Sequence, residues 1–272
     1  MVWLLSLRQG YPVDKPSMDY IKHMMVWRLD CQMAAMILTR VPMHIDYPND
    51  RKIAMSYWAF PLVGILVAGI SAIPGVILLL AGVPPLAVGA VMLAVVALIT
   101  GGMHEDGLAD IADSLGGHDQ ASRLQIMRDS RIGAFGVIAL VLILVIQLAC
   151  LAELATQGVN VLIGAWLAAA VLSRAMMALQ AWSYPPPDQT GFAHSVGSPD
   201  QNTMLIALGL GLGLAILLSG SLMVFLAAGF AVLTTFLIGA AFNWHLGGIN
   251  GDGLGATQML SSAVIFMVMA IS

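Results

Sequence analysis

From Ile53 to the C-terminus the sequence is a series of apolar stretches, each close to the length of one bilayer crossing. About 20 helical residues cross the hydrocarbon core, and lipid offers no hydrogen-bond partners, so these stretches must form helices or strands of a closed barrel. Barrel strands alternate between apolar and polar residues, whereas these runs are continuously apolar. We therefore expect seven transmembrane helices, at residues 53–80, 86–103, 134–156, 159–180, 203–219, 221–242 and 254–272.

The composition agrees with a membrane protein. Of 272 residues, 59% are hydrophobic and only 10% are charged, which is unlike a water-soluble domain. All eleven Lys and Arg residues lie at or before Arg174, so the chain has no basic surface that would bind nucleic acid. The predicted fold class is an all-α, polytopic membrane bundle in contact with the lipid bilayer, and the sequence leaves open whether it forms a homo-oligomer.

The N-terminal region differs from the rest. Residues 24–40 contain an uninterrupted apolar run only from Met33 to Leu38, flanked by charged residues, which predicts an amphipathic helix lying in the interface rather than a span. We expect residues 24–272 to form a single membrane-embedded domain. Residues 1–23 are expected to be an extension, with Met24 or Met25 as the native start.

Prolines and glycines inside the spans predict how the helices bend and pack. Pro61 and Pro74 predict bends in the first span. Gly209, Gly211 and Gly213 predict a small-residue face on the fifth span for close helix contact.

The positive charges predict the orientation in the membrane. Seven Lys and Arg residues precede the first span and three more lie between the second and third spans, whereas the short connectors carry none. Because cytoplasmic loops are enriched in Lys and Arg, the N-terminus and the polar loops at 104–132, 181–202 and 243–253 are expected on the cytoplasmic side of a bacterial inner membrane.

The first of these loops contains an acidic cluster. Asp106, Asp110 and Asp113 are spaced i, i+4 and i+7, so on a helix they project from one face, within about 60° of one another. Carboxylates this close repel unless a cation neutralises them, and all-oxygen ligands favour a hard ion such as Mg²⁺, often shared with substrate phosphates. The alternative is a solvated acidic turn at a helix end.

Two groups of basic residues are candidates for phosphate binding. Arg128 and Arg131 follow the acidic cluster in the same loop, and Arg174 lies inside the fourth span near its cytoplasmic end. Guanidinium groups form paired hydrogen bonds with phosphate oxygens. The first two arginines are equally explained by the cytoplasmic enrichment in positive charge, and Arg174 either reaches a phosphate or extends to the membrane surface.

The glycine-rich segment 247–256 opens the last span. Its five glycines allow close approach of the backbone to a ligand, and a helix N-terminus favours anions. Asp252 is the only acidic residue after Asp200. A carboxylate here is often just a helix cap, but its expected location on the same face as the triple-Asp cluster favours a role in the site.

Together these features favour phosphoryl transfer. The sequence shows no Ser-His-Asp or Cys-His arrangement and no Walker A motif, so covalent catalysis has no evident nucleophile. Phosphoryl transfer instead relies on cations that stabilise charge and on positioning. An ion-coupled transporter is the alternative class, disfavoured because transporters place such charges near the midplane.

The motifs in their order resemble the cobalamin synthase (adenosylcobinamide-GDP ribazoletransferase) family along most of the chain. The matching segments are Leu38-Thr39-Arg40-Val41-Pro42, Phe60-Pro61-Leu62-Val63-Gly64, His104-Glu105-Asp106-Gly107-Leu108-Ala109-Asp110, Ile126-Met127-Arg128-Asp129-Ser130-Arg131-Ile132-Gly133, Ser173-Arg174 and Gly247-Gly248-Ile249-Asn250-Gly251-Asp252. Ser114 departs from the Gly that this family has after the third Asp.

The resemblance implies a Mg²⁺-dependent enzyme. A ribose hydroxyl of α-ribazole, or of its 5′-phosphate, would attack the cobinamide-side phosphorus of adenosylcobinamide-GDP, and GMP would leave. The carried-over roles are metal binding by Asp106, Asp110, Asp113 and Asp252, proton transfer by His104, Asp106 or Asp110, and phosphate binding by Arg128, Arg131, Arg174, Asn250 and Gly251.

A CDP-alcohol phosphotransferase of lipid synthesis is the second enzyme reading. That family also uses an Asp-rich face and metal. Its motif has Asp-Gly-x-x-Ala-Arg, where this chain has Asp106-Gly107-Leu108-Ala109-Asp110, so the motif does not support this alternative.

Overall fold

The computed structural model describes residues 18–43, 45, 51–129, 131–184, 186 and 196–271, with side chains from residue 25 onward. Within these residues the regular structure is entirely helical, which confirms the predicted fold class. The elements are α2 (Met18–Leu38), the 3₁₀ helix η1 (Ile53–Ala59), α3 (Phe60–Leu80), α4 (Pro85–Thr100), α5 (Met103–Ser114), α6 (Gln120–Met127), α7 (Ala134–Thr156), α8 (Val159–Ser183), α10 (Gln201–Ser219), α11 (Met223–Leu246) and α12 (Gly251–Met269).

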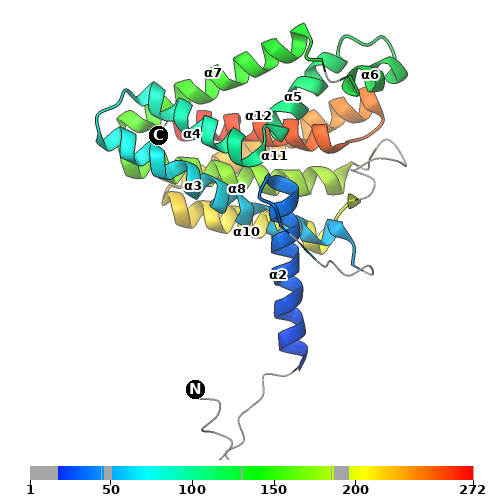
Figure 1. Cartoon of the computed structure of the whole chain (residues 1–272), viewed down its shortest axis with the longest axis horizontal. Coiled ribbons are helices and arrows are strands. Elements are labelled where there is room, and N and C mark those ends of the chain that lie inside the picture. The colour runs from blue at the N-terminus through cyan, green and yellow to red at the C-terminus, as the bar shows by residue number, and fades with distance from the viewer. Residues whose placement is uncertain are drawn as a thin grey trace, which may run out of the picture.

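The helices cross the molecule as the apolar runs predict. In the described residues six segments are long and apolar enough to span a bilayer, namely η1 with α3, then α7, α8, α10, α11 and α12. The pair α4 and α5, bent by 90°, gives a seventh if the two helices are counted as one broken span. The short turns and the C-terminus lie at one end of the bundle, and the connectors around α5–α6 and between α11 and α12 lie at the other (Figure 1).

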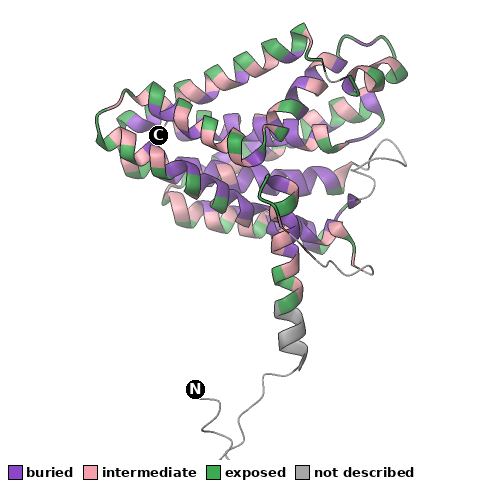
Figure 2. Cartoon of the chain, viewed as in Figure 1, coloured by how far each residue is buried: buried purple, intermediate pink, exposed green. Residues whose placement is uncertain are grey.

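Two helices form the centre of the bundle. In their most apolar windows 78% of α8 and 72% of α12 is buried, compared with 22–28% of α7, α10 and α11. Figure 2 shows the same contrast, with buried residues concentrated on the inner helices and exposed residues along α7 and α10. The outer helices therefore present their apolar side chains to lipid, and α8 and α12 are available to carry buried polar groups.

The glycines of α10 do not share one face, so this part of the sequence prediction was wrong. A Cβ on Gly211 would lie 2.6 Å from the Cβ of Ala175 on α8, but one on Gly209 or Gly213 would meet nothing within 4 Å. Successive helical residues are about 100° apart, which places Gly211 roughly opposite the other two. Only Gly211 permits the close approach of α10 to α8.

The prolines of the first span differ in effect. Pro61 lies in the first turn of α3, directly after η1, where its missing N–H costs no hydrogen bond, and the bend expected there stays a prediction. Pro74 lies inside α3, which continues to Leu80.

Helix α2 lies across the long axes of the bundle helices (Figure 1). Its contact with the bundle includes the fully buried Asp30, which accepts hydrogen bonds from Arg51 Nε at 2.8 Å and from Trp58 Nε1 at 2.9 Å. This crossing direction suits the interfacial helix expected for residues 24–40, whose membrane position stays a prediction. Most of the expected N-terminal extension, residues 1–17, lies outside the described residues.

The connector at 104–132, expected as a polar loop, contains the helices α5 and α6. Leu108 and Ile111 of α5 are buried against the bundle, while Asp106 is exposed. A short amphipathic helix of this kind lacks the apolar length of a span, so hydropathy alone does not find it. The structure thus places the three aspartates on a helix, as their spacing required.

Candidate functional site

Helices α5 and α12 cross in close contact because glycines lie at the crossing. A Cβ on Gly107 would lie 2.7 Å from the carbonyl oxygen of Asp252 and 2.9 Å from its Cα. A Cβ on Gly255 would lie 3.2 Å from the Cα of His104. The two backbones are therefore adjacent at the residues next to the acidic side chains.

The crossing brings Asp106 and Asp252 to one cavity of about 240 Å³, although they are 146 positions apart in the sequence. His104 and Gly251 line the same cavity. The expectation that the acidic residues of the two connectors share one pocket is confirmed for this pair.

Asn250 holds the Asp252 carboxylate. Its side-chain N–H donates to Asp252 Oδ2 at 2.9 Å, and its side-chain oxygen accepts from the Gly253 N–H at 3.0 Å, which caps α12. The predicted phosphate-binding residue Asn250 therefore orients an acidic side chain and begins the helix. Gly251, the first residue of α12, is exposed on the cavity.

The other two aspartates of the cluster have different surroundings. Asp110 is half-buried, and the charges of Asp106, Asp252 and Asp113 all act on it. Asp113 accepts hydrogen bonds from the backbone N–H groups of Gly133 at 2.6 Å and Gly136 at 2.8 Å. It therefore caps the N-terminus of α7, a tertiary contact that the spacing of the aspartates did not reveal.

The donor set fits a magnesium ion shared with a substrate. Within the described residues, no three His, Cys, Asp or Glu side chains lie close enough together to hold a metal ion by themselves. Mg²⁺ is commonly bound by one or two carboxylates, substrate phosphates and water rather than by a closed protein cage. Asp106 and Asp252 match that pattern, and the metal-binding roles of Asp106, Asp110, Asp113 and Asp252 stay predictions.

The arginines of the first polar connector do not line this cavity. Arg128 is exposed, and neither it nor Arg131 is among the lining residues. Arg131 donates to Asp129, and this hydrogen bond lowers the pKa of the Asp129 carboxyl. The phosphate-binding role of Arg128 and Arg131 stays a prediction.

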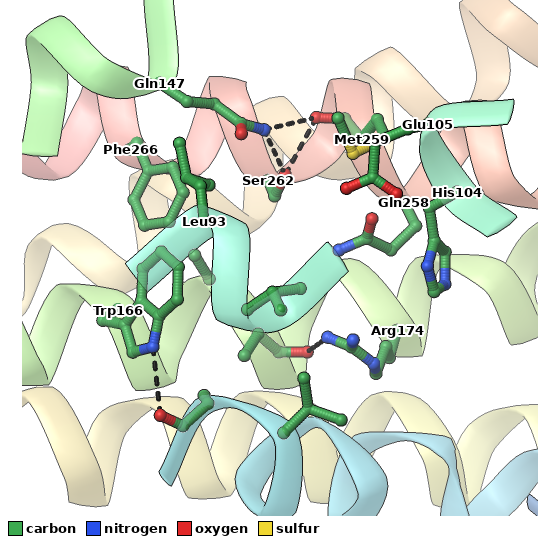
Figure 3. A pocket seen from close by; sticks show the side chains of 15 residues that line it. Leu93, His104, Glu105, Gln147, Trp166, Arg174, Gln258, Met259, Ser262 and Phe266 are labelled. Carbon is green, nitrogen blue, oxygen red and sulfur yellow. Dashed lines mark hydrogen bonds between the residues drawn. The ribbon is translucent and has the colours of Figure 1, made fainter. Parts of the chain in front are cut away.

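A second, smaller cavity of about 40 Å³ adjoins the site inside the bundle. Figure 3 shows His104, Glu105, Arg174 and Gln258 directed toward one space. The Arg174 side chain is 2% exposed and donates to the Ala170 carbonyl at 3.2 Å, so it does not extend to the membrane surface. Its Nε and Nη2 atoms and Glu105 Oε2 have no hydrogen-bond partner among the described residues.

This second cavity places opposite charges beside the acidic helix. The Glu105 carboxylate acts electrostatically on Arg174, and His104 lines both cavities. Glu105 was not a predicted site residue, although it lies inside the His104–Asp110 motif. Its position between His104 and Asp106 gave no sign that it points into the bundle.

The fold and the cavity define a polytopic membrane protein with an acidic site at one end of its helical bundle. A family model described as Cobalamin-5-phosphate synthase matches residues 30–270. The chain is 36% identical to an adenosylcobinamide-GDP ribazoletransferase of Sinorhizobium medicae over 89% of this chain and 96% of that protein. Proteins of the same name from Rhizobium etli and a Polaromonas species are 37% and 35% identical over 90% and 88% of this chain and 97% and 95% of their own.

The chain therefore belongs to the adenosylcobinamide-GDP ribazoletransferase family, a family of transferases in cobalamin biosynthesis. No solved structure matches it. The resemblance carried by the sequence motifs is confirmed across nearly the whole chain.

Proposed function

We propose that the protein is a Mg²⁺-dependent phosphotransferase that joins adenosylcobinamide-GDP to α-ribazole or its 5′-phosphate. The products are adenosylcobalamin, or its 5′-phosphate, and GMP. Family membership supports the cobalamin step. The observation that carries the catalytic assignment is the convergence of Asp106 and Asp252 on one cavity from positions 146 residues apart in the sequence.

The acidic residues of the cavity and the start of α12 would have separate roles in this reaction. When bound, Mg²⁺ would neutralise the diphosphate and stabilise the charge that develops on it. Asp106 and Asp252 would hold the ion, and Asn250 keeps the Asp252 carboxylate in place. The exposed N-terminus of α12 at Gly251 favours the negatively charged phosphate groups.

The reaction exchanges one P–O bond for another. A ribose hydroxyl oxygen of the acceptor bonds to the cobinamide-side phosphorus, the P–O bond to the GMP phosphate breaks, and GMP leaves with the bonding electrons. The hydroxyl proton passes to a base in the same cavity. His104 and Asp106 line it, and His104 Nε2 is buried without a hydrogen-bond partner among the described residues.

Metal dependence provides the first test. Purified protein in detergent, supplied with adenosylcobinamide-GDP and α-ribazole, is expected to release GMP with Mg²⁺ and to stop on addition of EDTA, because the diphosphate is then no longer neutralised. Excess Mg²⁺ should restore the rate, as measured by chromatography of GMP and the corrinoid product. Release of CMP from a CDP-alcohol lipid in place of GMP, or equal rates with EDTA, would contradict the proposal.

We also propose that the acidic cavity faces the cytoplasm from a bacterial inner membrane. Support comes from the Lys and Arg residues that precede the first span and occupy the 104–132 connector. With Cys31 and Cys150 replaced by alanine, a cysteine introduced at the exposed Arg128 is expected to react with a membrane-impermeant maleimide in inverted vesicles but not in spheroplasts. The opposite labelling pattern would reverse the orientation.

A further inference from the structure

The cavity that contains Asp106 and Asp252 has a second wall that phosphate chemistry does not explain. This wall is apolar and comes from four other parts of the fold, α2, η1 with α3, α8 and the segment before α10. Apart from the half-buried Ile37, its side chains are at most 5% exposed, so they are already packed in the bundle. The main contributors are Leu38, Tyr57, Phe60, Met177 and Val196.

The acidic and imidazole lining groups come from the two remaining helices. His104 and Asp106 belong to α5, and Asp252 belongs to α12. His104 is 1% exposed, and its Nε2 atom has no hydrogen-bond partner among the described residues. A buried polar atom without a partner is costly, so this atom is suited to a ligand hydrogen bond. The ligand that fits is apolar on one side and carries a hydroxyl on the other.

We propose that this cavity binds the acceptor nucleoside, with its planar aromatic base against the apolar wall and its ribose hydroxyl toward His104 and Asp106. The inference rests on the proposed function and adds the binding site of the second substrate. Aromatic and aliphatic side chains are the usual surroundings of a flat ring, and a few polar groups set its orientation.

Size and polarity separate this ligand from the other substrate. The cavity of about 240 Å³ is near the lower end of small-molecule sites, which suits a bicyclic base but not a corrin macrocycle. Guanine has several amide and amine groups that need partners, whereas Tyr57 supplies the one hydroxyl among the described residues of the apolar wall. A benzimidazole base has a single free ring nitrogen, so it leaves few groups unsatisfied there.

A polar substitution in the apolar wall tests the inference. In Met177→Gln the side chain keeps its length but places an amide against the base, so the KM for α-ribazole is expected to rise about tenfold with the KM for adenosylcobinamide-GDP unchanged. Met176→Gln is the matched control, because Met176 is equally buried on α8 but lies outside the cavity. The control should leave both KM values unchanged.

The wild-type protein supplies a second measurement that does not depend on a variant folding. Free benzimidazole is expected to inhibit GMP release competitively with α-ribazole and not with adenosylcobinamide-GDP. A higher KM for adenosylcobinamide-GDP alone, unchanged KM values in Met177→Gln, equal effects in the two variants, or competition with the GDP substrate would each overturn the inference. These outcomes require an active enzyme, so they are distinct from failure of the proposed function, in which wild type releases no GMP.

Discussion

Replacing Asp106 or Asp252 by asparagine is expected to lower GMP release by about 1,000-fold, the scale of losing a main electrostatic contact to a transition state. Each substitution keeps the shape of the side chain but removes the charge that would hold Mg²⁺ at the diphosphate. Both residues line the same cavity, so either loss should be nearly as severe as the double substitution. The measurement is the initial rate at saturating substrates and Mg²⁺.

Asp119→Asn is the matched control for these variants. Asp119 is an exposed acid of the same connector, and it caps α6, a task that asparagine performs equally well. This variant should keep the wild-type rate. If Asp106→Asn or Asp252→Asn kept more than half of the wild-type rate, the assignment of these carboxylates would be wrong.

Gly107→Ala is expected to lower the rate by about 100-fold without touching a charged group. The added Cβ would lie 2.7 Å from the carbonyl oxygen of Asp252 and 2.9 Å from its Cα. Because both of these are backbone atoms, the helices α5 and α12 must move apart. That movement separates the carboxylates and lowers the free energy of unfolding by roughly 1–3 kcal/mol. Activity and thermal unfolding in detergent measure the two effects.

Gly213→Ala provides the comparison. A Cβ at this position of α10 meets nothing within 4 Å, so the substitution should keep full activity and stabilise the helix by about 0.5–1 kcal/mol. Wild-type activity in Gly107→Ala would show that the close crossing of α5 and α12 is not needed for catalysis.

The bundle was predictable from the sequence because crossing a bilayer imposes a length and a continuous apolar character on each helix. The packing of the helices was not. Gly211 contacts α8, while Gly209 and Gly213 do not. Such contacts depend on which face of each helix packs against a neighbour. In a uniformly apolar helix, the order of residues does not identify that face.

The site was predictable in its acidic residues and not in its construction. The spacing of Asp106 and Asp110 and the isolation of Asp252 pointed to them, and the orientation rule placed them on one side of the membrane. A hydrogen bond between separate segments assigns Asp113 to the start of α7, and a local hydrogen bond at the start of α12 joins Asn250 to Asp252. The apolar wall around Met177 comes from residues that resemble ordinary core.

The central claim is that carboxylates of α5 and α12 bind one cation together with the diphosphate. Mn²⁺ titration followed by electron paramagnetic resonance, in the presence of adenosylcobinamide-GDP, measures this directly in wild type, Asp106→Asn, Asp252→Asn and the double variant. We expect each single substitution to weaken Mn²⁺ binding and the double variant to be little weaker than either, since residues of one site are not additive. Independent, additive losses, or wild-type affinity in either single variant, would contradict the account.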